Sequence, residues 1–338
     1  MNAADPILQL GEDGGFLLFE TVGALILSDG ILVVENEPPR LRVVDWHGTT
    51  IRDAGRAGGG PGEYQTIGSV ARLRGDSVFV YDIDAKRVSI LDRGLEFARS
   101  FALTGDESPM VTRAIPGLGG VVGSTAARIM PGGGPGRYRP ETSLVLFDSA
   151  GSFRLTLAPM LAREMHVVEN GGFIIPLLPR VSIWSATPTN VYLGTGESTL
   201  LEAVDPVGVR RPFAEVNADP MVLTEREKRA VVDSLAQRAT EARARRVRRT
   251  AERVPLPDAL PPYDDMLVDD QLHVWVASYG NPLRRSRPWY SYSESGDLLR
   301  TVCLPTTLQV TDIRAGVAVG IQLDSVGRER IAAYRLNE

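Results

Sequence analysis

The sequence is poor in the residues that build strong chemical motifs. Its 338 residues contain one cysteine, Cys303, and three histidines. A single cysteine excludes an intramolecular disulfide and a thiolate metal cluster. No apolar run approaches the roughly 18 residues that a membrane helix needs, and the first residues lack the basic and apolar regions of a signal peptide. We therefore expect a cytoplasmic protein as the sequence stands, or a cell-envelope or exported protein if the N-terminus is trimmed.

A strong excess of either charge is also missing. The formal net charge is -5 and the isoelectric point is near 5.5. Such a chain has no overall field that gathers nucleic acid or anionic lipid, so a basic partner site must be local. We expect no nucleic-acid partner and no transmembrane segment. The 43% hydrophobic content is enough for a sizeable core, and we expect a monomer.

Turn-forming residues are abundant. The 34 glycines and 23 prolines favour many short strands over long helices. Apolar runs at 24–28, 31–35, 40–45 and 49–56 predict four strands joined by hairpin turns. A similar set follows in the next stretch of chain, which indicates a repeated four-stranded unit.

A second repeated pattern is an apolar run that ends in an acidic residue and is followed by a glycine-containing turn. The acidic residues are Asp45, Asp92, Asp148, Asp205 and Glu294. The carboxylate can accept hydrogen bonds from turn amides, and glycine tolerates positive φ. The first intervals are close to the roughly 40 to 50 residues of a four-stranded propeller blade, and the last interval contains an insertion. We predict an all-β, six-bladed β-propeller of four-stranded antiparallel blades.

The ends of the chain complete the predicted ring. Three strand candidates at 309–314, 317–323 and 330–336 make an incomplete sixth blade. A strand at 7–10 can supply its fourth strand, which would close the ring and protect its edges. The prediction is a single propeller domain over residues 1–338.

One segment departs from the β pattern. Residues 224–253 contain no glycine or proline, and Thr224 and Glu227 have the spacing of a capping box, so we predict one α-helix there. The segment has ten basic and five acidic side chains and an apolar stripe. The stripe residues are Val231, Leu235, Ala239 and Ala242. We expect a helical insertion over 214–262 between blades four and five.

Two stretches carry a family resemblance. The loop 55–64, GRAGGGPGEY, and the strand pair 77–92, with Asp82 before Arg87, look like the NHL-type repeat. The whole chain resembles the bacterial six-bladed β-propeller proteins of largely unassigned function, including their helical insertion late in the ring. The resemblance implies the fold and leaves the function open.

The loop 55–64 could be taken for a phosphate cradle, because consecutive backbone amides bind anions. No Lys-Ser/Thr pair follows it, and a strand comes next, so the comparison with a Walker motif is poor. We interpret it as a connection between blades. A partial echo at 132–138 replaces Glu63 by Arg137 and supports repetition more than chemistry.

Metal sites have weak support. His47, His166 and His273 do not fall together on first strands, so we interpret them as unrelated residues. In propeller lactonases, a divalent cation is held by Glu, Asn and Asp near the channel. The corresponding candidates here are Glu63, Asp264 and Asp265, with Glu169 and Asn170 less certain. We expect no cofactor, with Ca²⁺ or another divalent cation as the alternative.

The remaining candidates are basic and aromatic side chains before or within the middle blades. They are Arg137, Tyr138, Arg139, Arg163 and Arg180, to which Glu63, Tyr64, Tyr263 and Asp264 are added as loop residues at the same face. They could form a mouth for an anionic ligand or glycan, or arginine stems that cover apolar surface. We predict a non-enzymatic binding or scaffolding propeller for a small molecule, glycan or protein. The alternative is a metal-dependent hydrolase or lyase that uses channel carboxylates.

Overall fold

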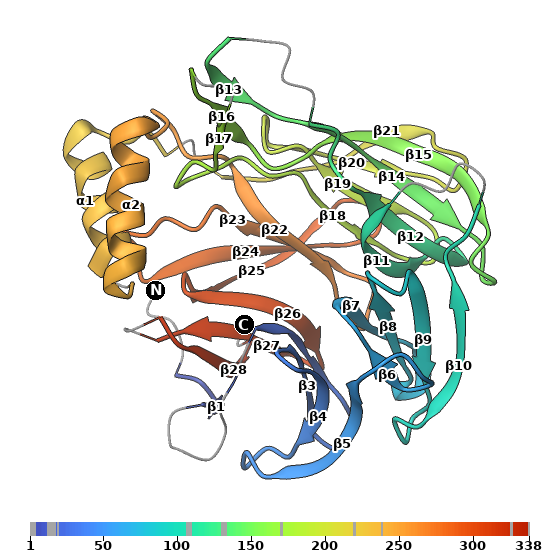
Figure 1. Cartoon of the computed structure of the whole chain (residues 1–338). Coiled ribbons are helices and arrows are strands. Elements are labelled where there is room, and N and C mark those ends of the chain that lie inside the picture. The colour runs from blue at the N-terminus through green and yellow to red at the C-terminus, as the bar shows by residue number, and fades with distance from the viewer. Residues whose placement is uncertain are drawn as a thin grey trace.

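The protein is a ring of six antiparallel β-sheets with two helices at its rim (Figure 1). The computed structural model describes residues 5–11, 18, 20–105, 110–129, 134–169, 172–218, 221–237, 239–324 and 327–336. In these ranges no helix is both long and apolar enough to cross a membrane. The architecture is the predicted six-bladed β-propeller.

The first three blades follow one another along the chain, each as an antiparallel meander. Blade 1 holds β2 (Thr21–Ile26), β3 (Ile31–Asn36), β4 (Pro39–Val44) and β5 (Thr50–Ala57), with the short β6 (Glu63–Tyr64) parallel to β5. Blade 2 holds β7 (Ile67–Arg72), the 3₁₀ turn Arg74–Asp76, β8 (Val78–Asp82), β9 (Arg87–Leu91) and β10 (Phe97–Ala102). Blade 3 holds β11 (Val111–Gly117), β12 (Gly120–Thr125), β14 (Glu141–Phe147) and β15 (Phe153–Leu161).

The other three blades repeat the arrangement. Blade 4 holds β18 (Ile183–Ala186), β19 (Val191–Gly194), β20 (Leu200–Val204) and β21 (Arg210–Glu215). Blade 5 holds β22 (Tyr263–Val268), β23 (Val274–Ser278), β24 (Ser286–Tyr292) and β25 (Leu298–Pro305). Blade 6 holds β26 (Leu308–Arg314), β27 (Val317–Leu323), β28 (Glu329–Arg335) and the N-terminal β1 (Leu8–Leu10). The first strands of neighbouring blades contact one another around the full ring, so they surround a central channel.

The ring is closed by the two ends of the chain. β1 pairs antiparallel with β28, with Leu8 opposite Ala333 and Leu10 opposite Ile331. This pairing confirms the predicted role of the N-terminal strand. It gives blade 6 a fourth strand, and Leu8 and Leu10 are buried in the core between blades 6 and 1.

The core consists of six apolar layers, one between each pair of neighbouring blades. Because side chains alternate along a strand, one blade sends residues into the layers on both of its sides. Val80 packs toward blade 1, whereas Phe79 and Tyr81 pack toward blade 3. This double burial explains why the second strands are apolar at almost every position.

The repeated acidic turns have the predicted chemistry. At Asp148, one carboxylate oxygen accepts hydrogen bonds from the amides of Ala150 and Ser152, and Gly151 takes a φ of +91°. Asp45 and Asp205 make the same pair of contacts in their own blades. In blade 5, however, the equivalent residue is Ser293, whose hydroxyl accepts from the Asp297 amide. The prediction that Glu294 is the turn-capping residue of blade 5 was therefore wrong by one position.

The helical segment forms two helices, not the one predicted. They are α1 (Glu225–Gln237) and α2 (Glu241–Arg253), which contact each other at the rim (Figure 1). The chain breaks at Thr240, whose extended ψ of 158° places it at the N-cap of α2 and lets the chain fold back. The capping box at Thr224 and Glu227 is present. Val231 is buried against Leu178, Leu223 and Leu260, but no residue of α2 in the described chain is buried, so the predicted stripe ends with α1.

A small extra sheet stands beside blade 3. It consists of β13 (Gly136–Tyr138), β16 (Met165–Val167) and β17 (Phe173–Ile174). β13 lies between the second and third strands of blade 3, so the echo at 132–138 is not a connection between blades as 55–64 is. Residues 132 and 133 of this stretch lie outside the described residues.

Candidate ligand-binding site at the channel mouth

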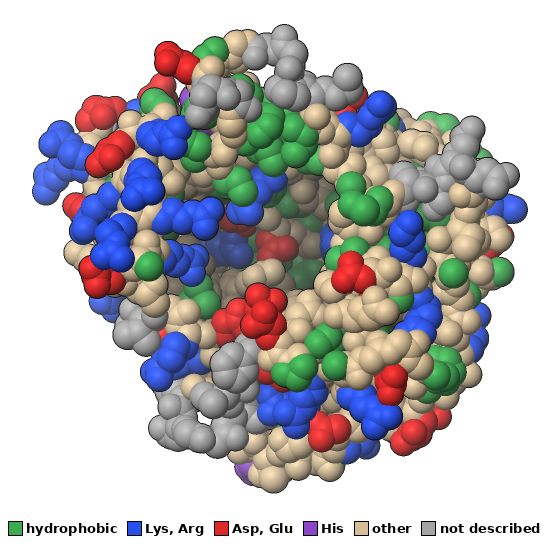
Figure 2. All heavy atoms as spheres, in the orientation of Figure 1, with side chains coloured by type: hydrophobic (Ala, Val, Ile, Leu, Met, Phe, Trp, Pro, Cys, Tyr) green, Lys and Arg blue, Asp and Glu red, His purple; other side chains and the backbone are tan. Residues whose placement is uncertain are grey.

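The two faces of the ring carry different loops. Strand direction alternates within each blade, so the connections between blades and the loops joining second to third strands share one face, which we call the upper face. The helices, the β13–β16–β17 sheet and the described residues of the connection from β15 to β18 all belong to this face. The opposite, lower face carries short turns such as the one at Asp148. Figure 2 shows a hollow at the centre of the ring in which basic and acidic side chains gather.

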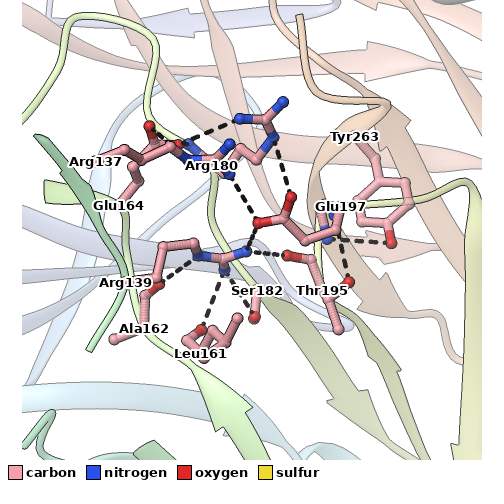
Figure 3. Close-up of polar contacts among 11 residues, drawn as sticks. Arg137, Arg139, Leu161, Ala162, Glu164, Arg180, Ser182, Thr195, Glu197 and Tyr263 are labelled. Atoms are coloured by element: carbon pink, nitrogen blue, oxygen red, sulfur yellow. Dashed lines mark hydrogen bonds and ion pairs between the residues drawn. The ribbon is translucent and has the colours of Figure 1, made fainter. Parts of the chain in front are cut away.

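Five charged residues from loops of blades 3 and 4 meet on the upper face and form what we call the mouth cluster (Figure 3). They are Arg137, Arg139, Glu164, Arg180 and Glu197. Arg137 lies 3.0 Å from Glu164 and 2.8 Å from Glu197. Arg180 lies 3.7 Å and 3.6 Å from the same two carboxylates. Three guanidinium groups therefore share two carboxylates, which leaves one positive charge uncompensated.

Arg139 is the buried arginine at the base of the mouth cluster. Its side chain is 5% exposed and contacts Glu197 at 2.8 Å. Its other N–H groups donate to the carbonyl oxygens of Thr195, Ala162 and Leu161. Because these acceptors come from both blades, Arg139 ties the loops together. Its function is structural, and it leaves Arg137 and Arg180 as the arginines nearer solvent.

The electrostatics of Glu197 reflect these neighbours. Partial burial by itself raises the pKa of Glu197, but the hydrogen bond from Arg139 and the charges of Arg137 and Arg180 outweigh it and lower the pKa overall. The carboxylate therefore stays ionised at neutral pH. Arg137, which is 43% exposed, has its guanidinium held at the surface by this anion.

Aromatic rings and a further arginine border the cluster. Tyr138 on β13 and Phe173 on β17 have ring centroids 6.2 Å apart. Arg163 is exposed and makes no hydrogen bond or ion pair within the described chain. Tyr279, which donates to the Pro179 carbonyl, is close enough to Arg163, Glu164 and Arg180 for their charges to affect its pKa; burial is the dominant effect and raises it. The site thus combines an aromatic wall with a free cation.

A second set of charged residues lies at the channel, and we call it the channel group. It consists of Asp264, Asp265 and Arg287 of blade 5 together with Arg113 of blade 3. The strand register skips a residue at Asp264 in β22. Asp264 pairs with Arg287 of β24 and accepts from the Gly280 amide at 3.0 Å. The next residue, Asp265, lies 4.0 Å from Arg287. Burial raises the pKa of Asp265 to about 6, against the opposing effects of Arg287 and Arg113.

Glu63 belongs to its own loop. Its carboxylate accepts from the Gly60 amide at 2.9 Å and pairs with Arg56 at 2.8 Å. These contacts lower its pKa, the Gly60 hydrogen bond most. A Cβ at Gly58 would lie 2.2 Å from this carboxylate, which explains the glycine. Arg87, which opens β9, donates to the carbonyl oxygens of Gly59 and Glu63. The loop is thus closed by its own charges.

Two predicted site tyrosines are in the core. Tyr64 is fully buried between blades 1 and 2, and Tyr263 is fully buried between blades 4 and 5, where its hydroxyl donates to the Leu200 carbonyl. Neither ring can reach a ligand at the surface. Both support loops, since the Tyr263 hydroxyl also accepts from the Gly196 amide, one residue before Glu197.

The metal candidates do not converge. Within the described ranges, no group of three or more His, Cys, Asp or Glu could hold a metal ion. Glu63 is closed into its loop, and Asp264 is bound by Arg287. His273 contacts Asp269 in the β22–β23 turn, and His166 lies on β16. Asn170 lies outside the described residues.

The sequence predicted all three arginines of the mouth cluster as candidates but not their carboxylate partners. Glu164 and Glu197 sit in loops of two different blades, and no local pattern relates them. Arg113 and Arg287 were also missed. A usable signal existed for these two, because a charged residue within an otherwise apolar strand of a propeller is costly unless it has a partner or a task.

Comparisons with known proteins agree with the fold. No family model matches the sequence, and no curated protein is similar to it. A member of the DUF4221 family from Bacteroides vulgatus is similar in structure, with a TM-score of 0.50 and 8% identity over 99% of this chain and 98% of that one. A Bacteroides thetaiotaomicron protein of unknown function has a TM-score of 0.40 and 11% identity, over 96% and 72% of the two chains. Streptogramin B lyase has a TM-score of 0.42 and 8% identity, over 96% of both. The neighbours include an enzyme and proteins of unknown function, so the fold alone does not identify an activity.

Proposed function

We propose that this propeller is a non-enzymatic binding protein that captures an anionic small molecule, glycan or protein segment on its upper face, above the channel. The observation that carries the proposal is the mouth cluster, in which three arginines share two glutamates. Guanidinium groups bind carboxylate and phosphate through paired hydrogen bonds, so an uncompensated arginine set is suited to an anion.

The surroundings of the cluster support recognition of a ligand larger than an ion. Arg163 offers an exposed guanidinium that makes no hydrogen bond or ion pair within the described chain. Tyr138 and Phe173 place two rings beside the arginines, on a sheet that projects from blade 3. Rings of this kind pack against sugar or ring faces while the arginines bind anionic substituents. A uronic, sialylated, sulfated or phosphorylated ligand fits this combination.

Equilibrium dialysis and native mass spectrometry with a panel of such anionic sugars and phosphates test the proposal. We expect the double variant Arg163→Ala/Arg180→Ala to bind at least about tenfold more weakly, since each lost charged contact contributes about 1.5–3 kcal/mol. The matched control is Arg93→Ala/Arg154→Ala, which removes two exposed arginines from lower-face turns.

Two outcomes would reject the proposal. One is equal binding by the double variant and the control. The other is the absence of any ligand in dialysis, mass spectrometry and pull-down, together with measurable turnover of a substrate. Elemental analysis of chelator-free protein addresses the hydrolase or lyase alternative, which requires a bound divalent cation or stabilisation on adding one.

A further inference from the structure

Arg113 is a half-buried cation at the wall of the channel. It lies on β11, directly after the skipped register position. Its guanidinium is 4.4 Å from the ring centroid of Trp184 on β18, and Nη1 donates to the Trp184 carbonyl at 3.0 Å. β11 and β18 are neighbouring first strands of the ring. The indole ring and the carbonyl oxygen of Trp184 therefore fix the orientation of the guanidinium but supply no formal negative charge.

Other arginines on first strands have a carboxylate partner. Arg72 of β7 lies 3.1 Å from Asp312, and Arg314 of β26 lies 2.7 Å from Asp76. Arg113 has no carboxylate within 4.0 Å among the described residues. Burial lowers its pKa below the ordinary arginine value. A buried charge without a counterion destabilises the fold, which makes its presence here informative.

The carboxylates on the facing wall do not neutralise Arg113. Asp264 is taken up by Arg287 and the Gly280 amide. Asp265 is the anion whose charge reaches Arg113, but Arg287 also attracts it and the Met266 amide donates to it. The two arginines and two aspartates balance in formal charge, but both carboxylates lie nearest Arg287, so the Arg113 side of this group has no anion in contact with it. The centre of the ring, which the first strands surround, is hollow on the face shown in Figure 2.

We infer that Arg113 is an inner anion subsite, which binds a carboxylate or phosphate group of the ligand inside the channel while the rest of the ligand lies at the mouth cluster. The inference rests on the proposed binding function. The guanidinium has five N–H donors and uses one on Trp184, so a bidentate pair remains available to an oxyanion. The anion supplies the counterion that Arg113 lacks among the described residues. The Trp184 ring, over which the guanidinium lies, holds the guanidinium in place for this contact.

Fluorine NMR of protein labelled with 5-fluorotryptophan tests this directly. The chain has four tryptophans, and Trp184→Phe identifies the Trp184 signal. Titration with inorganic phosphate, and separately with acetate, is compared with sodium chloride at equal ionic strength. We expect a saturable shift of the Trp184 signal with the oxyanions, because a bound anion offsets the electric field of the guanidinium at the Trp184 ring. Trp46 at the lower face and Trp275, which has its own partner in Arg300, should not move.

Variants separate the inner subsite from the mouth. Arg113→Gln should abolish the Trp184 response, whereas Arg163→Ala/Arg180→Ala should keep it and lose only the larger ligand. Asp265→Asn removes an opposing negative charge and should tighten phosphate binding roughly three- to tenfold at about pH 7.5. This gain does not depend on Arg113→Gln folding.

The inference fails if phosphate leaves the Trp184 signal unchanged, if all four tryptophans shift alike, or if Asp265→Asn weakens binding. Such a result would leave the mouth proposal standing, provided that the larger ligand still responds to the Arg163→Ala/Arg180→Ala change. If instead every variant still binds the larger ligand and the Trp184 response is intact, the mouth proposal is rejected and the inner subsite stands. Acetate and phosphate responses compared at equal concentration distinguish a carboxylate from a phosphate source.

Discussion

Two charged regions of the upper face differ in how their charges are balanced. In the loop 55–64, Glu63 is neutralised by Arg56 and by the Gly60 amide, all within a few residues of sequence. In the mouth cluster, three arginines, which are Arg137, Arg139 and Arg180, outnumber the two glutamates of separate loops that they share. The first arrangement completes a turn, whereas the second leaves positive charge for a partner. Glycine-rich sequence drew attention to the first region, but charge balance favours the second as the site.

The difference also explains how each region is built. A closed local loop needs glycines, because its backbone must fold over its own carboxylate, as Gly58 does over Glu63. The mouth needs a buried anchor to bring distant loops together, and Arg139 supplies it. The arginines above that anchor can then stay partly exposed.

The largest expected effect comes from removing the anchor. Arg139→Ala leaves three loop carbonyls without their side-chain donor and removes the buried one of the arginines that bind Glu197, so we expect it to destabilise the protein by about 3 kcal/mol. Arg137→Ala is the matched change at a neighbouring surface position and should cost below about 1 kcal/mol. Denaturant unfolding of both variants measures this. Equal losses of unfolding free energy in the two variants would mean that Arg139 does not anchor the cluster and that the distinction between the two arginines is wrong.

An intermediate effect is expected from Asp265 through pH. Burial raises its pKa to about 6, above the unfolded value, so between about pH 4 and about pH 6 the folded protein holds a proton that the unfolded chain has lost. This contribution to stability is complete below the unfolded pKa and is lost as the pH rises through the folded pKa. The wild type should lose about 3 kcal/mol relative to Asp265→Asn across this window.

Denaturant unfolding of wild type and Asp265→Asn at several pH values gives the difference curve, in which the other carboxylates cancel. A flat difference would show that Asp265 is solvated as in the unfolded chain. A rise with pH would have the wrong sign for a buried carboxyl group and would place a stronger cation beside it than the structure has.

The smallest effect is expected at Glu63. Glu63→Gln keeps the side-chain shape but removes the charge that Arg56 and Gly60 neutralise, and both partners stay solvated at the surface. Stability should fall less than in Arg139→Ala, and binding of the larger anionic ligand should not change. A loss of ligand binding comparable to that of the mouth variants would break the comparison and return the loop 55–64 to the list of sites.

The fold could be predicted from the sequence because its repeated units are specified by residues close together in the chain. Strands joined by short turns, and carboxylates such as Asp148 that cap them, act within a few residues. The ends of the chain were predicted to close the ring, and β1 pairs with β28. The single helix was wrong because the break at Thr240 uses an N-cap in extended conformation and needs no glycine or proline.

The site could be predicted only in part. Arg137, Arg139, Arg163 and Arg180 were predicted to form a basic mouth because they precede or enter the middle blades. Their counterions could not be, since Glu164 and Glu197 meet them only through the stacking of two blades. Tyr64 and Tyr263 looked like loop aromatics, but each follows a loop as it enters a first strand, where the ring is drawn into a core between blades.

The central claim is that free positive charge on this ring is concentrated at the mouth and channel of blades 3 to 5. Crystals soaked in selenate test it most directly, because the anomalous signal of selenium locates each bound oxyanion. The account predicts selenate at Arg113 and beside Arg163 and Arg180, with none at the loop 55–64. Selenate bound at Gly58 to Gly60, with an empty channel, would contradict it.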